Sequence, residues 1–117
     1  MQHAIHGLRH AINHHPNFVI HLAVSGTVIV ASQLLRLSPP EWLVIVLTIT
    51  VGLVIELINT SIEAVVDLVT EEWRQSARLA KDTSAAAMLV YAVGATVIAL
   101  IIFIPKFIGV WRSVIGI

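Results

Sequence analysis

The sequence predicts an all-α membrane protein, with three membrane-spanning helices preceded by a helix that lies on the membrane surface. Hydrophobic residues make up 57% of the 117 residues and charged residues only 12%, against about 25% charged in an ordinary soluble domain. The charges are also unevenly placed, because three long stretches carry no Asp, Glu, Lys or Arg: residues 18–35, 42–55 and 83–105. A helix needs roughly 20 apolar residues to cross a bilayer, so these stretches mark the spans of one membrane domain, residues 1–117.

The overall charge excludes one class of partner. Seven basic and seven acidic residues give a net charge of zero, whereas binding to nucleic acid phosphates needs a basic excess. The chain has no cysteine, so neither a disulfide framework nor a thiolate metal site is expected. Its first residues are rich in histidine rather than apolar, unlike a secretory signal peptide.

The surface helix is expected over residues 1–17 and the first span over about 18–36. In the surface helix, apolar side chains fall on one side, as in helices that lie in the membrane interface: Ala4, Ile5, Leu8, Ala11 and Ile12. Pro16 is expected to separate this helix from the span that follows, because a proline breaks the helical hydrogen-bond pattern.

Paired prolines separate the first span from the second. Residues 36–41, with the sequence RLSPPE, are expected to form a tight turn because prolines cannot continue a helix. The second helix is expected over about residues 42–70, since its apolar pattern continues beyond the uncharged stretch. Its last third carries charged residues and is expected to leave the hydrocarbon.

The third span is expected over about residues 83–110. A polar connection, residues 71–81, precedes it, and Asp82, Thr83 or Ser84 could cap its first turn. With three spans, the N-terminus and this connection lie on one side, which carries four Lys and Arg residues against three on the other. The small excess favours that side as cytoplasmic.

Four polar residues share one face of the second helix. At about 100° per residue, Glu63 and Asp67 each lie roughly 20° from Glu56 around the helix axis. Asn59 lies about 60° from Glu56. A carboxylate at a membrane boundary is costly, so such residues usually pair, change protonation or act in catalysis. This face predicts a functional site, although a helix–helix contact or an ion path would also place polar groups on one face.

The residue types of this face suit phosphoryl transfer. Glu56 directly follows the apolar run and could act as a general base. Glu63, nearer the water, could hold a divalent metal ion, since Mg²⁺ prefers one or two carboxylates together with phosphate oxygens. Lys81 and Asp82 begin the third span at the same end, where a lysine could neutralise phosphate charge.

These residues resemble a known family, the bacterial diacylglycerol kinases, which include the undecaprenol kinases. The family signature Glu-x-x-Asn-[Ser/Thr]-[Ala/Ser]-Ile-Glu-x-x-Val-Asp appears as ELINTSIEAVVD, residues 56–67, and a second block appears as AKDTSAAA, residues 80–87. The resemblance implies an integral membrane lipid kinase that works as a homotrimer in the bacterial inner membrane, with its active site on the cytoplasmic face. The implied reaction is phosphorylation of a membrane lipid alcohol by ATP, either diacylglycerol, to give phosphatidic acid, or alternatively undecaprenol.

The resemblance also implies roles, position by position. Glu56 matches the general base that takes the proton of the lipid hydroxyl, and Glu63 matches a carboxylate ligand of the Mg²⁺ that bridges the ATP phosphates. Supporting or substrate contacts are implied at Asn59, Asp67 and Ala85. Nucleotide contacts are implied at His3, His15, Glu63, Glu72, Trp73, Arg74, Lys81 and Asp82.

One position departs from the family pattern. Where the family usually carries a second metal-binding glutamate, two residues before Asn17, this chain has His15. An imidazole suits Mn²⁺ or Zn²⁺ better than Mg²⁺. The departure leaves open weak Mg²⁺ binding, another metal, a neighbouring ligand, or a non-catalytic relative with an impaired metal site. The i, i+4, i+8 spacing of His6, His10 and His14 fits a polar helix face better than a metal chelate.

Overall fold

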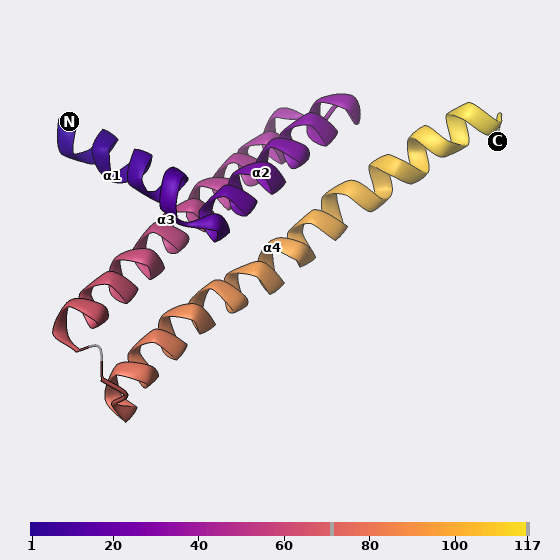
Figure 1. Ribbon diagram of the computed structural model, residues 1–117. Coiled ribbons are helices and arrows are strands. Elements are labelled where there is room, and N and C mark those ends of the chain that lie inside the picture. The colour runs from indigo at the N-terminus through magenta and orange to yellow at the C-terminus, as the bar shows by residue number, and fades with distance from the viewer. Residues whose placement is uncertain (71, 117) are drawn as a thin grey trace.

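The computed structural model describes residues 1–70 and 72–116, and every regular element within them is a helix. Four helices follow one another along this part of the chain (Figure 1): α1 (Gln2–His14), α2 (Pro16–Leu34), α3 (Pro39–Val69) and α4 (Gln75–Ile115). Glu71, which the sequence places in the connection before the third span, lies outside the described residues. The predicted all-α class is confirmed for the residues described.

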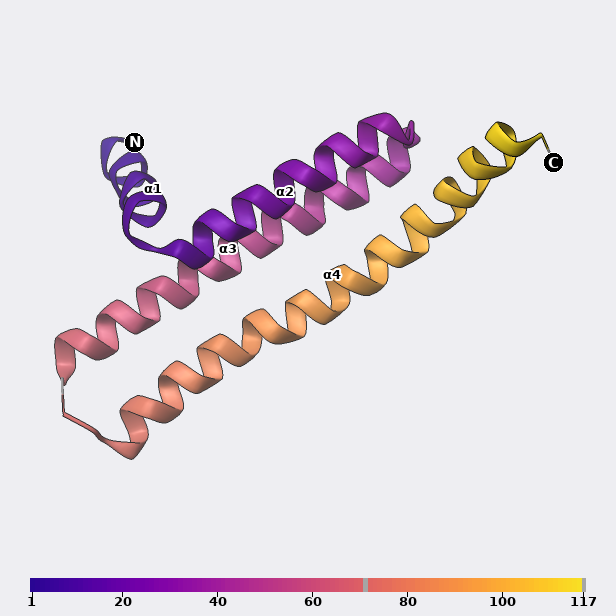
Figure 2. The same ribbon diagram turned by 45° about the vertical axis from the view of Figure 1, so that its right-hand side comes forward.

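Helix α3 is the centre of the arrangement. Helix α2 lies side by side with it in both ribbon views, and α4 runs back along it from the α3–α4 connection (Figure 1 and Figure 2). The molecule is elongated, with extents of 63 × 33 × 21 Å. Helix α1 contacts α2 and lies at the same end of the molecule as the α3–α4 connection. We call this end the charged end.

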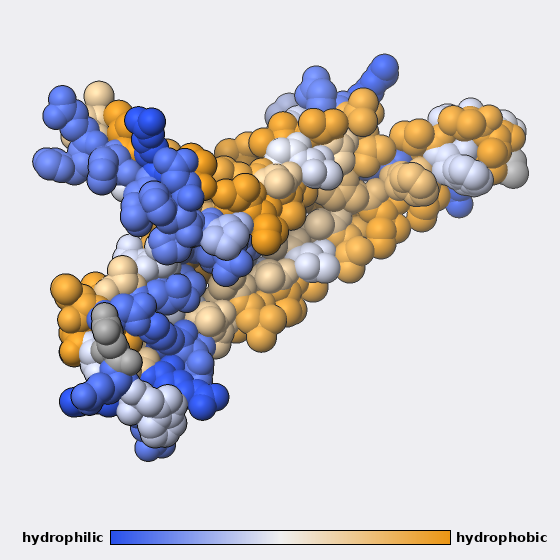
Figure 3. Space-filling view, viewed as in Figure 1, coloured by the Kyte–Doolittle hydropathy of each residue, from blue (hydrophilic) through white to orange (hydrophobic). Residues whose placement is uncertain are grey.

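The three long helices present an apolar surface that water solvates poorly. Helices α2, α3 and α4 are each long and apolar enough to cross a membrane, which confirms the three predicted spans at that level. Apolar residues cover the length of these helices, whereas polar residues gather over α1 and the α3–α4 connection (Figure 3). Such a surface needs a bilayer, or further copies of the chain, to cover it. That α1 lies on the membrane surface stays a prediction.

One extended residue separates α1 from α2. His15 has φ −117° and ψ 97°, and Pro16 takes the first position of α2, where its missing N–H interrupts no helical hydrogen bond. The break predicted at Pro16 is confirmed, although α1 ends at His14 rather than at residue 17.

The turn between α2 and α3 is shorter than the sequence predicts. Arg36 turns the chain in the left-handed conformation, with φ 51°. Helix α3 then begins at Pro39 and not near Trp42, because prolines fit the first helical positions, whose N–H groups have no partner within the helix. Both the N–H and the hydroxyl of Ser38 donate to Oε2 of Glu41 at 2.6 Å, which closes the first turn.

The connection between α3 and α4 is also shorter than predicted. The sequence predicts a polar connection over residues 71–81 and a span from about residue 83, yet α4 begins at Gln75. The stretch QSARLAKD consists largely of residues with good helix propensity, and its polarity reflects the membrane boundary rather than the end of the helix. Lys81 and Asp82 therefore lie inside α4. Arg74, not Asp82, precedes its first turn.

Three contacts far from the charged end fix how α4 lies along α3. The Tyr91 hydroxyl donates to the backbone oxygen of Thr48 at 2.6 Å. The Tyr91 ring packs on buried Gly52 so closely that an added methyl group would overlap it, as small residues allow between membrane helices. Farther along, the Lys106 ammonium lies 2.9 Å from Oε2 of Glu41. These contacts determine which residues of α3 and α4 meet at the charged end.

Candidate active site

A cavity of about 280 Å³ lies where α2, α3 and α4 come together near the charged end. Its walls are formed by Asn17, Ile20, His21, Glu56, Asn59, Glu63, Ala85 and Met88. We call it the carboxylate cavity. Residues three, four and seven apart share a face of a helix, so α3 brings Glu56, Asn59 and Glu63 into one wall, as the sequence predicts. Ala85 joins them from α4.

Glu56 is the only charged residue that is buried in the described part of the chain, at 3% exposed. Its Oε2 atom lies 4.0 Å from Nε2 of His21, which α2 contributes. A buried carboxylate is unfavourable unless neighbouring groups or a bound molecule compensate it. Its place in the wall of a cavity makes it the strongest candidate for a chemical role.

A chain of hydrogen bonds links α4 to the carboxylates of α3. The Ser84 hydroxyl donates to Oδ1 of Asn59 at 2.6 Å, and Nδ2 of Asn59 donates to Oε1 of Glu63 at 3.3 Å. Both Ser84 and Asn59 are buried. The Ser84 bond holds the side chain of Asn59 so that its amide nitrogen faces Glu63. The sequence indicates Ser84 only as a possible cap, and its small polar side chain within the AKDTSAAA block is the one signal that could have marked it.

A second cavity, of about 290 Å³, lies between α3 and α4 closer to their connection. We call it the basic cavity, after its three cationic side chains, although three carboxylates also line it. It is lined by Val66, Asp67, Thr70, Glu72, Trp73, Arg74, Ala77, Arg78, Lys81 and Asp82. The structure thus brings together five positions at which the resemblance implies nucleotide contacts: Glu72, Trp73, Arg74, Lys81 and Asp82. Asp67 lines this cavity rather than the carboxylate cavity.

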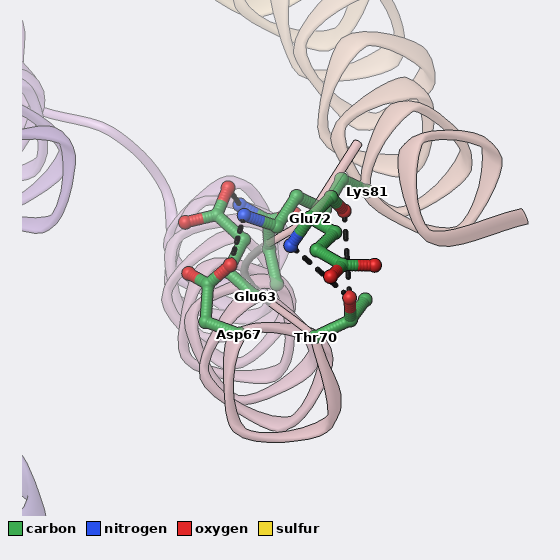
Figure 4. A network of polar contacts seen from close by, with 6 residues as sticks. Glu63, Asp67, Thr70, Glu72 and Lys81 are labelled. Atoms are coloured by element: carbon green, nitrogen blue, oxygen red, sulfur yellow. Dashed lines mark hydrogen bonds and ion pairs between the residues drawn. The ribbon is translucent and has the colours of Figure 1, made fainter. Parts of the chain in front are cut away.

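Ion pairs order the side chains of the basic cavity. The Lys81 ammonium reaches from α4 to Oδ1 of Asp67 at 2.5 Å, on the side of α3 that also carries Glu63 (Figure 4). Arg78 pairs with Asp82 on its own helix, with 3.4 Å between Nε and Oδ2. Cationic side chains that line a cavity open to water are suited to bind phosphate groups.

The N-terminal residues of the predicted site lie apart from both cavities. His15 lines a separate cavity of about 360 Å³ between α1 and α3, opposite Leu57, Thr60, Ser61 and Ala64. Leu57 directly follows Glu56, and Ala64 directly follows Glu63. At about 100° per residue, this face of α3 is therefore turned by about 100° from the face that carries the two carboxylates. His3 is exposed on the first turn of α1. The structure therefore does not bring His15 and Glu63 together in one cavity, and no group of three or more potential metal ligands occurs in residues 1–70 and 72–116.

A sequence model described as prokaryotic diacylglycerol kinase matches residues 2–103, which is most of the chain. The chain belongs to the prokaryotic diacylglycerol kinase family. One relative, named undecaprenol kinase, from Bacillus subtilis (strain 168), is 39% identical over 104 residues, covering 89% of this chain and 85% of the relative. Another, named diacylglycerol kinase, from Synechocystis sp. (strain ATCC 27184 / PCC 6803 / Kazusa), is 34% identical over 104 residues, covering 88% of this chain and 59% of the relative.

Family membership confirms the predicted class of enzyme, a lipid kinase with membrane helices. A divalent metal ion would find a suitable donor at this site. Mg²⁺ is usually held by one or two carboxylates together with substrate phosphates and water. Glu63 supplies one carboxylate, and its hydrogen bond from Asn59 orients it toward the cavity.

Proposed function

We propose that the protein transfers a phosphoryl group from ATP to the hydroxyl of a membrane lipid alcohol, with Glu56 as the general base. The observation that carries the proposal is the burial of Glu56 in the wall of a cavity that it shares with Asn59 and Glu63. A carboxylate shielded from water is well suited to take the proton of an alcohol as the alcohol attacks. The lipid's hydroxyl would enter the carboxylate cavity from the bilayer side.

The nucleotide would approach from the water side, through the basic cavity. Glu63 would hold the divalent metal ion, which neutralises charge on the transferring phosphoryl group. Lys81 and Arg74 would contact phosphate oxygens, and Trp73 offers an aromatic surface near the same cavity. Asp67 keeps Lys81 extended toward α3 through their ion pair. Positioning and electrostatic stabilisation are expected to supply most of the rate in such a reaction.

The hydrocarbon chain of the substrate would lie in an apolar cavity of about 240 Å³ between α2, α3 and α4. Its walls are mostly apolar, and His21 borders both this cavity and the carboxylate cavity. If the lipid's hydroxyl lies at Glu56, its hydrocarbon chain can therefore enter the apolar cavity directly beside it. Diacylglycerol and undecaprenol both meet this description, and the two named relatives support each of them equally.

The proposed setting is the bacterial cell membrane, with the charged end in the cytoplasm. The charged end carries the larger number of Lys and Arg residues, as cytoplasmic segments of membrane proteins do. A homotrimer is the proposed assembly, as the resemblance implies. In the described structure the most apolar part of α4 has no buried residue, so neighbouring copies have ample surface against which to pack.

A second candidate is a non-catalytic relative, and the position of His15 is what favours it. An imidazole stands where the family usually has the second acidic ligand, and it lies next to a different face of α3 from the face that carries Glu63. His15→Glu separates the two candidates. If the wild-type protein is inactive with Mg²⁺, Mn²⁺ and Zn²⁺ while His15→Glu is active, the non-catalytic interpretation is correct.

The experiment for the main proposal is a radiolabelled phosphate transfer assay. Purified protein in mixed micelles would be given labelled ATP, one of the three metal ions, and either diacylglycerol or undecaprenol. We expect a labelled lipid product with at least one of the two alcohols, and none with Glu56→Gln, although that variant keeps the helical circular dichroism spectrum of the wild type. Full activity in Glu56→Gln would remove Glu56 as the base.

A further inference from the structure

His21 is the only imidazole that lines the carboxylate cavity among the described residues, and the proposed mechanism so far gives it no task. It stands on α2 with Nε2 at 4.0 Å from Oε2 of Glu56. Its side chain is 28% exposed, whereas that of Glu56 is 4% exposed. His21 is thus less enclosed than the carboxylate beside it, and the carboxylate cavity that both line also holds Asn17 and Glu63, nearer the charged end.

The proposed chemistry creates a need for a route by which a proton leaves Glu56. In each turnover the lipid hydroxyl gives its proton to Glu56, so a neutral carboxylic acid remains after the phosphoryl group has moved. Glu56 must lose this proton before it can act as a base again. Because its side chain is almost fully shielded from water, a direct exchange of the proton with solvent is hindered.

We infer that His21 removes this proton from Glu56 and passes it to water, an inference that rests on the proposed function of Glu56. The O–H bond of the Glu56 carboxylic acid breaks and an N–H bond forms at Nε2 of the neutral imidazole, which leaves a carboxylate and an imidazolium. The imidazolium then gives up one proton to water and returns to the neutral form. One proton leaves the site for each lipid phosphorylated, and no other reactant is needed.

The geometry and the surroundings of His21 suit this step. Catalytic hydrogen bonds are often long before substrate binds, and a proton also passes over one bridging water, so 4.0 Å is within reach of a transfer. The titratable groups that border the two cavities of His21 are Glu56 and Glu63 from α3 and Tyr91 from α4. The two carboxylates stabilise the positive charge that His21 gains, and the Tyr91 hydroxyl is occupied by its bond to Thr48.

His21 acts through Glu56 and not on the substrate, so it is a positioning residue. Its test must therefore measure an effect of proton transfer, such as the pH dependence of kcat. The variants are His21→Gln, which keeps polarity without a proton-accepting ring, and His21→Ala, which leaves room for a small molecule. His6→Gln is the matched control, because His6 is exposed on α1. The kcat and KM values for lipid and ATP would be measured between about pH 5.5 and 8.5, the range in which imidazole changes charge.

We expect kcat of both variants to fall at least about tenfold, as for loss of a proton-transfer group, with little change in either KM. Free imidazole should restore kcat of His21→Ala, and the restored rate should rise with pH as the neutral form of the added imidazole becomes more abundant. His6→Gln should behave as the wild type. Circular dichroism and thermal unfolding in detergent would show that the variants are folded.

Three results would overturn the inference while leaving the lipid kinase proposal in place. They are an unchanged kcat in His21→Gln, a loss of kcat in folded His21→Ala that imidazole does not restore, and a wild-type kcat that is independent of pH across the same range. The last of these needs no variant and so decides the matter even if neither variant folds. Failure of the proposed function looks different, because the wild type would then phosphorylate neither lipid with any of the metals.

Discussion

The hydrogen bond from Ser84 to Asn59 is a buried contact between α4 and the polar face of α3. Ser84→Ala removes it, together with the approach of the same hydroxyl to the Lys81 backbone oxygen at 3.0 Å. The bond is 2.6 Å long and both partners are buried. The variant leaves Oδ1 of Asn59 without this donor in a place that is 7% exposed. An unsatisfied buried polar group costs about 1–3 kcal/mol.

The expected loss divides between stability and substrate binding. Hydrogen bonds between membrane helices average about 0.6 kcal/mol and reach about 1.7 kcal/mol, so we expect the unfolding free energy to fall by about 1 kcal/mol. The second effect passes through Asn59, whose amide orients Glu63 at 3.3 Å. A released Asn59 would let Glu63 turn away from the metal ion that we propose it holds, and a loss of about 1.4 kcal/mol there would raise the KM for metal–ATP about tenfold.

Steady-state kinetics with varied metal–ATP, at saturating lipid, would measure the second effect, and thermal unfolding in detergent the first. Ser113→Ala is the matched control, because Ser113 is also on α4 but is exposed and donates within its own helix, to the Val110 oxygen at 2.7 Å. A KM for metal–ATP that stays within about twofold of the control would refute the argument that Ser84 positions Glu63 through Asn59.

Three further predictions concern the contacts between α3 and α4. Gly52→Ala should overlap the Tyr91 ring and lower the unfolding free energy by about 1–3 kcal/mol, seen as a lower melting temperature; an unchanged melting temperature would contradict the packing. Tyr91→Phe should cost about 1 kcal/mol by loss of its bond to Thr48, with the KM for ATP unchanged because the bond lies far from the basic cavity. Lys81→Gln should lower kcat/KM for ATP about 100-fold in the transfer assay, more than Arg78→Gln, whose charge pairs within α4.

The helices and the polar face were predictable because both depend on spacing along a single helix. Uncharged stretches of sufficient length define spans whatever they pack against, and a period of 3.6 residues places Glu56, Asn59 and Glu63 on one face without knowledge of the other helices. The structure confirms both features. Polarity was the weaker guide, because residues 75–82 are polar yet helical.

The contacts between helices were not predictable from one sequence. Ser84 meets Asn59, and Tyr91 meets Thr48, only because α4 lies against α3 in one particular position along its length. A shift of α4 by one turn, about 5.4 Å, would keep every helix and the whole apolar pattern but would separate both pairs. Local spacing carries no information on such a shift, so these partners become visible only in the folded chain.

The position of His15 is a second feature that residue spacing along the sequence could not predict. The resemblance implies that His15 takes the place of a second metal ligand, whereas in this single chain His15 follows α1 in an extended conformation and shares a cavity with Leu57 and Ala64. Which face of α3 lies next to His15 depends on the direction in which α1 crosses α3, and the spacing of residues within α1 does not determine that direction. The predicted metal role of His15 stays a prediction and depends on the His15→Glu comparison.

The course of α3 from the apolar surface to the charged end (Figure 3) fits the proposed site, at which one substrate would come from the bilayer and the other from water. Glu56 and Glu63 are seven residues apart, which places them roughly 10 Å apart along the axis, and Asp67 lies one further turn toward the connection. Glu56, which is farthest from the connection, is buried beside the apolar cavity. Asp67, which is nearest the connection, pairs with Lys81 in the basic cavity. A lipid hydroxyl arriving from the bilayer and a triphosphate arriving from water would therefore meet between Glu56 and Glu63. A helix that lies entirely in water would offer no apolar surroundings for the lipid, and a helix that lies entirely within the bilayer would exclude the nucleotide. The proposed site therefore needs a spanning helix that continues beyond the membrane.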